Sequence, residues 1–178
     1  MMNLPNKLTI ARVAAIPFII AALYQNAGSW RLIALILFCL ASFTDFLDGY
    51  LARKNNIVTD FGKLLDPIAD KLLVLSTMIM FTYRGMMIAW VVILMLSREL
   101  AVDGLRSLAA SKGKVIAAGQ LGKIKTCSQI ALILWMMISG IPVMSHWSGI
   151  VLTAWVVFIT LWSGVDYYYR NMNLITSK

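Results

Sequence analysis

The longest uncharged stretch of the sequence constrains its fold more than any other feature. Residues 126–165 contain no Lys, Arg, Asp or Glu, and Gly140, Pro142 and the Ser145-His146 pair lie near their centre. Because these are turn-forming residues, we interpret the stretch as two apolar helices joined by a turn. Two adjacent uncharged helices, each about 20 residues long, are typical of a chain that crosses a lipid bilayer.

Composition argues against a water-soluble domain. Of all residues 60% are apolar and 13% are charged, whereas soluble domains are about half apolar and about a quarter charged. We therefore predict an all-α polytopic membrane protein, a six-transmembrane-helix bundle in which residues 1–178 form a single domain. The helices are expected near residues 8–25, 31–53, 67–83, 86–110, 121–141 and 147–170.

The distribution of basic residues predicts the orientation in the membrane. Of the sixteen Lys and Arg, only Arg31 and Arg84 lie on one side of the predicted bundle, and the other fourteen lie toward the opposite side. Cytoplasmic loops carry the excess of Lys and Arg, so both termini are expected in the cytoplasm. The net charge of +8 then fits loops that face anionic lipid rather than nucleic acid.

Charged positions within the helices converge at one depth. Fourteen residues separate Arg31 from Asp45, and fourteen separate Arg84 from both Asp70 and Arg98. At 1.5 Å rise per residue, each segment covers roughly 21 Å. We therefore expect an active site near the cytoplasmic interface, where phospholipid headgroups lie.

Four of the eight acidic residues form two helical pairs. Asp45 and Asp48 are spaced i, i+3, and Asp66 and Asp70 are spaced i, i+4. Each pair therefore lies on one face of its helix. Carboxylates without nearby His or Cys favour Mg²⁺ or Mn²⁺ over zinc. The alternative is that these acids only form ion pairs with neighbouring cations, which are Arg53, Lys54, Lys63 and Lys71.

Small residues follow the first acidic pair. Gly49 and Ala52 lie on the stripe that begins at Asp45, and Arg53 lies one turn beyond Gly49. They leave room for a phosphate-bearing ligand whose oxygens Arg53 could bind. A close helix–helix contact is the alternative explanation.

The pattern Asp45-x2-Asp48-Gly49-x2-Ala52-Arg53-x8-Gly62-x3-Asp66-x3-Asp70 resembles the signature of the CDP-alcohol phosphatidyltransferase family at every fixed position. The later segments SRELAVDGLR and AAGQLGKIKT resemble the bacterial phosphatidylglycerophosphate synthase branch of that family. The resemblance implies transfer of a phosphatidyl group from CDP-diacylglycerol to sn-glycerol 3-phosphate, with CMP released. It also implies a homodimer in the bacterial cytoplasmic membrane, two Mg²⁺ or Mn²⁺ ions per site, and phospholipid biosynthesis as the role.

The resemblance also assigns roles to individual residues. The metal ligands would be Asp45, Asp48, Asp66 and Asp70, and Asp70 would also act as general base. CDP-diacylglycerol would be bound by Asn6, Thr9, Gly49, Ala52, Arg53 and Thr59. The phosphate of the acceptor would be bound by Arg98, Arg106, Lys123 and Lys125, for which contact with lipid headgroups is the alternative.

Other functions remain open on the sequence alone. Within the family, the acceptor could instead be that of a cardiolipin synthase or a phosphatidylserine synthase. From a different class, a small ion-coupled transporter would also place acids inside the membrane. A transporter is expected to have acids at the midplane with access from both sides, whereas no acidic residue is predicted here in the outer half.

Three smaller patterns give local expectations. Glu99 and Asp103 are placed to orient Arg98 by pairing, and Asp166 is placed to pair with Arg170. The single His146 lies in the predicted outer turn, and no catalytic role is assigned to it.

The predicted orientation can be tested by cysteine labelling. After replacement of the native Cys39 and Cys127, Asp60→Cys and Val115→Cys are expected to resist a membrane-impermeant maleimide in intact cells. A cysteine at position 28 lies in a predicted outer turn and should react. Labelling of position 60 or 115 from outside would show that the orientation is wrong.

Overall fold

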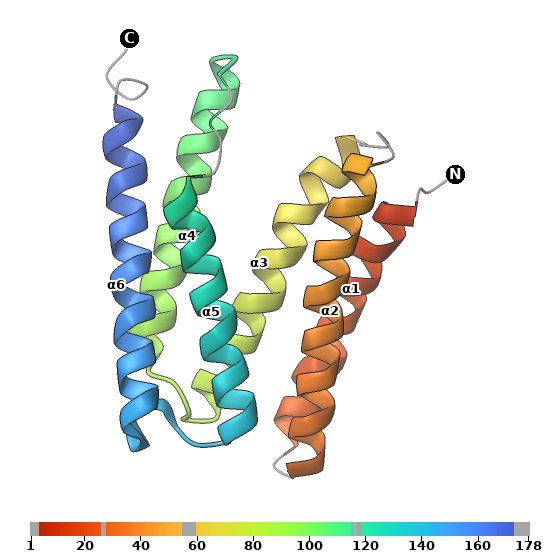
Figure 1. The fold of residues 1–178 in the computed structure, drawn as a ribbon, viewed down its shortest axis with the longest axis vertical. Helices are drawn as coiled ribbons and strands as arrows, with labels where there is room; N and C mark the ends of the chain where they lie inside the picture. Colours follow the sequence, from red (N-terminus) through yellow and green to blue (C-terminus); the bar gives the residue numbers. More distant parts are fainter. Residues whose placement is uncertain (1–3, 26–27, 55–59, 115, 117–118, 173–178) are drawn as a thin grey trace. The chain divides into compact units, whose positions relative to one another are not determined.

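The computed structural model consists of helices joined by short connections (Figure 1). The elements are α1 (Leu4–Tyr24), α2 (Gly28–Lys54), α3 (Asp60–Tyr83), α4 (Ala89–Ser111), α5 (Gln120–Ser139), the 3₁₀ helix η1 (Val143–Ser145) and α6 (Trp147–Arg170). The structure describes the backbone of residues 4–25, 28–54, 60–114, 116 and 119–172, and the side chains of residues 8–25, 28–44, 68–114, 116 and 119–172. No strand occurs within these ranges, which confirms the all-α prediction.

The helix positions agree with the predicted ones to about one turn, with one exception. Helix α3 begins at Asp60, seven residues before the expected start at Pro67. Proline lacks the backbone N–H of one helical hydrogen bond, but its fixed φ is compatible with a helix. As a result, one continuous helix carries both Asp66 and Asp70.

The chain divides into two compact units, residues 1–84 with 136–140 and residues 85–135 with 141–178. In the first unit, α1 packs against α2 and α3, and α2 also packs against α3. Their buried side chains include Leu23 of α1, Phe38 of α2 and Phe81 of α3. These apolar contacts align the three helices that carry the predicted acids and the nucleotide-binding positions.

In the second unit, α4 packs against α6. The buried residues of α4 recur every three or four positions and are Val91, Val92, Met95, Glu99, Val102, Leu105 and Ala109. Those of α6 are Gly149, Thr153, Val156, Ile159, Thr160, Ser163 and Tyr167. This spacing is that of one helical face, and both faces contain polar residues.

The turn between α5 and α6 is formed by the residues that the sequence singles out. Gly140 has φ 64° and donates its N–H to the Met136 carbonyl, which ends α5. His146 caps α6, because its Nδ1 accepts a hydrogen bond from the Ser148 N–H at 3.3 Å. The only histidine therefore has a structural role in this turn.

Large apolar side chains cover much of the outer surface of each unit. Phe18 of α1, Leu40 of α2, Trp90 of α4 and Phe158 of α6 are all more than half exposed. Among the described residues, Gln120–Ser139 and Trp147–Arg170 are long and apolar enough to cross a membrane, and Leu8–Tyr24 and Gly28–Thr44 are shorter apolar segments. The six-span bundle remains a prediction.

Two helical glycines in the second unit predict opposite effects of the same substitution. A Cβ at Gly149 would lie 2.5 Å from the Val143 carbonyl oxygen and 2.7 Å from the Trp135 ring, whereas a Cβ at Gly104 would meet no atom within 4 Å. Gly149→Ala is expected to destabilise the protein by about 1–3 kcal/mol through overpacking. Gly104→Ala is expected to stabilise it by about 0.5–1 kcal/mol. Thermal unfolding of the purified protein in detergent checks both signs.

Candidate active site

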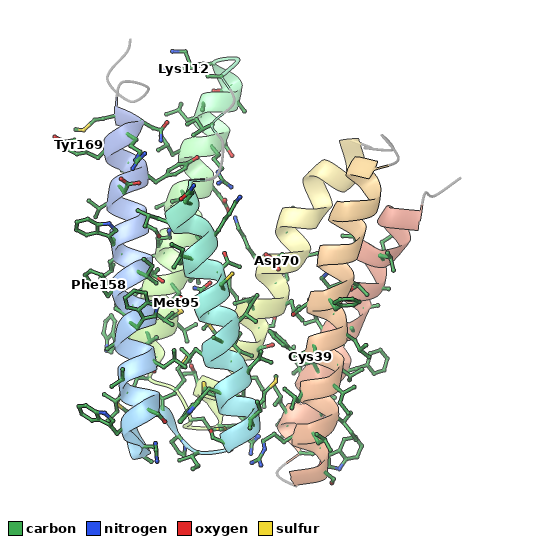
Figure 2. All side chains as sticks on the ribbon, viewed as in Figure 1. Cys39, Asp70, Met95, Lys112, Phe158 and Tyr169 are labelled. Atoms are coloured by element: carbon green, nitrogen blue, oxygen red, sulfur yellow. The ribbon has the colours of Figure 1, made fainter. Side chains whose placement is uncertain are left out.

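The first unit carries the predicted metal ligands on two packed helices. The backbone places Asp45 and Asp48 on α2, and Asp66 and Asp70 on α3. Asp70 is half-buried and engaged by a neighbouring group, and Figure 2 shows its position on α3. The side chains of Asp45, Asp48 and Asp66 lie outside the described residues. Among the described side chains, no three His, Cys, Asp or Glu lie together, so the four-acid ligand set remains a prediction.

Most of the predicted nucleotide-binding side chains are also outside the described part of the chain. These are Asn6, Gly49, Ala52, Arg53 and Thr59. Asn6 has its backbone in the first turns of α1, and Gly49, Ala52 and Arg53 have theirs in α2. Thr9 is described, and it is fully buried in α1.

The structure adds a charged residue to this region that the sequence analysis does not single out. Arg12 is 1% exposed and is among the largest fully buried side chains. Its Nε donates a hydrogen bond of 3.3 Å to the Ala41 carbonyl oxygen of α2. Ala41 lies one helical turn before Asp45, so Arg12 joins α1 to α2 next to the acidic segment. An arginine within an otherwise apolar helix is the signal that could have identified it, because such residues are usually functional.

In the second unit, two of the four predicted acceptor-binding residues lie around one buried carboxylate. Lys125 of α5 donates to Glu99 Oε1 of α4, and Arg98 Nη1 lies 3.6 Å from the same oxygen. The expectation that Glu99 pairs with Arg98 is confirmed. A Cβ at Gly164 would lie 3.1 Å from Arg98 Cγ, so this glycine leaves room for the arginine stem beside α6.

The other two predicted acceptor residues have different surroundings. Arg106 Nε donates to the Tyr167 hydroxyl at 3.0 Å, and its guanidinium carbon lies 5.5 Å from the centre of the Tyr167 ring. Lys123 is exposed on α5. Tyr167 was not predicted, because a buried tyrosine within a run of three gives no sequence signal of its partner.

The expected pair near the end of α6 is also confirmed. Arg170 Nε donates to Asp166 Oδ1 at 2.8 Å. The arginine side chain is 73% exposed, and an ion pair of this kind adds little stability. We assign it no role in catalysis.

The fold and these two polar groups define a helical protein with acids on α2 and α3 and cations on α4 and α5. Residues 2–161 match the CDP-alcohol phosphatidyltransferase family, and the chain belongs to this family.

Three similar proteins share the name CDP-diacylglycerol–glycerol-3-phosphate 3-phosphatidyltransferase. A protein of Bacillus subtilis is 44% identical and covers 100% of both chains. A protein of Rickettsia bellii is 44% identical over 93% of both chains. A protein of Salmonella choleraesuis is 34% identical over 93% of this chain and 92% of its own.

The Glu99–Lys125 pair predicts non-additive stability effects. Glu99→Leu removes the carboxylate that Lys125 and Arg98 share and is expected to cost about 3–5 kcal/mol. Lys125→Met leaves Glu99 with Arg98 as a partner and is expected to cost less. The double variant should be more stable than the sum of the two single losses predicts, because an apolar pair often replaces a buried ion pair at little cost. A double-mutant cycle on the unfolding free energy measures the coupling. Additive losses would show that the two side chains act independently.

Proposed function

We propose that this chain transfers the phosphatidyl group of CDP-diacylglycerol to sn-glycerol 3-phosphate, forming phosphatidylglycerophosphate and CMP. The observation that carries the proposal is full-length similarity at 34–44% identity to relatives named for this reaction. The buried cations of the second unit support an anionic acceptor, because a phosphate group needs cationic partners in a poorly solvated place.

The donor side of the site is assigned to the first unit. Asp45, Asp48, Asp66 and Asp70 would hold two divalent cations, Mg²⁺ or Mn²⁺. Their oxygen-only donor set on two packed helices is chemically suited to hard cations. When bound, such cations neutralise diphosphate charge and orient it.

The nucleotide headgroup is assigned to residues around the acids. Gly49 and Ala52 would let the backbone of α2 approach the headgroup, and Arg53 would donate to its phosphate oxygens. Thr59, Asn6 and Thr9 complete the proposed set. Thr9 is buried in α1 one turn before Arg12, which places it on the face of α1 that packs inward.

The chemical step needs a base beside the acceptor hydroxyl. Asp70 takes the proton of this hydroxyl. The hydroxyl oxygen of the acceptor then forms a bond to the β-phosphorus of CDP-diacylglycerol. The bond between that phosphorus and the bridging oxygen breaks, and CMP leaves. A carboxylate is a weak base, so the reaction depends on holding the alcohol within hydrogen-bond reach. The half-buried position of Asp70 on α3 suits this role.

The acceptor phosphate is assigned to Arg98 and Lys125, with Arg106 and Lys123 as further cations. Lys125 is buried, the Arg98 side chain is 11% exposed, and both converge on Glu99, which fixes them in place. Arg106 is already engaged by Tyr167, and Lys123 is exposed. We therefore expect Arg98 and Lys125 to contribute more to acceptor binding than the other two.

We further propose a multi-pass protein of the bacterial cytoplasmic membrane, with both termini in the cytoplasm and a homodimeric assembly. The exposed apolar faces of the helices and the uneven distribution of basic residues support the membrane assignment. A single domain over residues 1–178 is part of the same proposal.

The acceptor is tested by incubating the purified protein with labelled CDP-diacylglycerol and one alcohol at a time. Glycerol 3-phosphate is expected to release CMP, and glycerol, serine and phosphatidylglycerol are expected to release little. Release with one of those three instead would assign the chain to another branch of the family.

The metal ligands are tested by Asp45→Asn and Asp66→Asn. Mutation of a residue that only contacts a metal ligand typically costs about 10- to 100-fold in activity. Each of these two variants is expected to lose more activity than that. Chelation of divalent cations should mimic them. Asp166→Asn is the control, because it removes a carboxylate from an exposed pair on α6. Full activity of Asp45→Asn or Asp66→Asn in metal-free buffer would contradict the assignment.

A further inference from the structure

The buried face of α5 contains a second polar residue beside the Glu99–Lys125 pair. Gln129 is 3% exposed and lies four residues after Lys125, which is 4% exposed. Residues spaced i, i+4 share a helix face. Helical side chains lean toward the N-terminus of their helix, so the Gln129 amide is directed toward the turn that carries Lys125.

This amide has a donor that the described residues do not satisfy. Gln129 Nε2 is buried and has no hydrogen-bond partner among them, and the same holds for Arg98 Nε. Buried N–H groups are nearly always paired, and an unpaired one costs stability. Other polar side chains of this protein do find local partners, as Thr77, Thr82 and Thr126 do by donating to carbonyl oxygens four residues earlier.

The charge around these two donors favours an anion. Arg98 and Lys125 carry two positive charges and Glu99 carries one negative charge, so the cluster has a net charge of +1 when all three are ionised. Two unsatisfied N–H donors in a net cationic, buried cluster need oxygen atoms as acceptors. The oxygens of a bound anion would supply these acceptors.

We propose that Gln129 is an acceptor-binding residue, whose side-chain amide donates a hydrogen bond to an oxygen of glycerol 3-phosphate held by Arg98 and Lys125. The proposal rests on the proposed function and extends it to a residue outside the predicted site. Because the amide satisfies its donor only when the ligand is bound, Gln129 lowers the stability of the empty protein and raises the affinity for the acceptor.

Gln129→Leu separates this role from a structural one. It replaces an unsatisfied amide by an apolar side chain of similar size, so the thermal midpoint of the ligand-free protein should rise. The KM for glycerol 3-phosphate should rise about ten- to a hundredfold, the loss expected for a hydrogen bond to a charged group. The KM for CDP-diacylglycerol should change less than about twofold, well below that range. Gln129→Glu should be more severe, because it places a negative charge beside the phosphate.

Thr153→Val is a matched control. Thr153 is 3% exposed and its hydroxyl also lacks a partner among the described residues, but no charged residue lies within six positions of it in the sequence. This variant should also raise the midpoint, and it should leave both KM values unchanged.

A binding measurement without CDP-diacylglycerol completes the test. Glycerol 3-phosphate should raise the thermal midpoint of the original protein, since a ligand that binds only the folded state stabilises it. The same concentration should give a much smaller shift in Gln129→Leu. Inorganic phosphate and glycerol, tested separately, show whether the phosphate or the hydroxyl groups supply the oxygen.

The outcomes distinguish the inference from the proposed function. If the original protein transfers to glycerol 3-phosphate but Gln129→Leu keeps its KM and its thermal shift, the inference is wrong. An equal rise of both KM values with a lower midpoint would assign Gln129 to the fold and would also overturn it. If the original protein does not use glycerol 3-phosphate, the proposed function fails, and the thermal shifts with phosphate and glycerol 3-phosphate still decide whether Gln129 binds an anion.

Discussion

A charge inside an apolar helix must be hydrogen-bonded or paired, and this constraint organises both units. Arg12 of α1 meets it by donating to the Ala41 carbonyl of α2. Lys125 of α5 meets it by pairing with Glu99 of α4. Each of these contacts joins two different helices. The charged groups therefore fix the register of the helices as well as the positions of the side chains proposed for the site. Removal of Glu99 alone is expected to be costly because Lys125 stays buried.

The sequence was sufficient to predict the helices but not the side-chain contacts between them. The bounds of α6 and the turn at Gly140 were predicted closely from the uncharged stretches and the turn-forming residues. An apolar run between turn-forming residues permits few alternative helix bounds. The start of α3 was predicted seven residues late, because Pro67 was taken as a first helical residue and the helix continues through it.

For the site, ion pairs within one helix could be predicted from the sequence, and contacts between residues of different helices could not. Glu99 beside Arg98, and Asp166 four residues before Arg170, are neighbours on one helix, and both pairs occur. The partners of Lys125, Arg106 and Arg12 lie on other helices, 26, 61 and 29 positions away. Their pairing depends on how helices pack, which the spacing of residues within one helix does not specify. The acids could be identified by spacing and resemblance, and their joint geometry lies outside the described residues.

The carboxylate of Glu99 in the proposed anion-binding cluster has a consequence for turnover. On the proposed function, the phosphate of glycerol 3-phosphate is not consumed but remains in phosphatidylglycerophosphate, so the cations that bind the acceptor must also release the product. Glu99 keeps Lys125 paired in the empty site and reduces the net charge of the cluster from two to one. This lowers the affinity for acceptor and product alike. Binding that is equally strong before and after the chemical step does not accelerate that step, so a moderated phosphate site favours release without loss of rate.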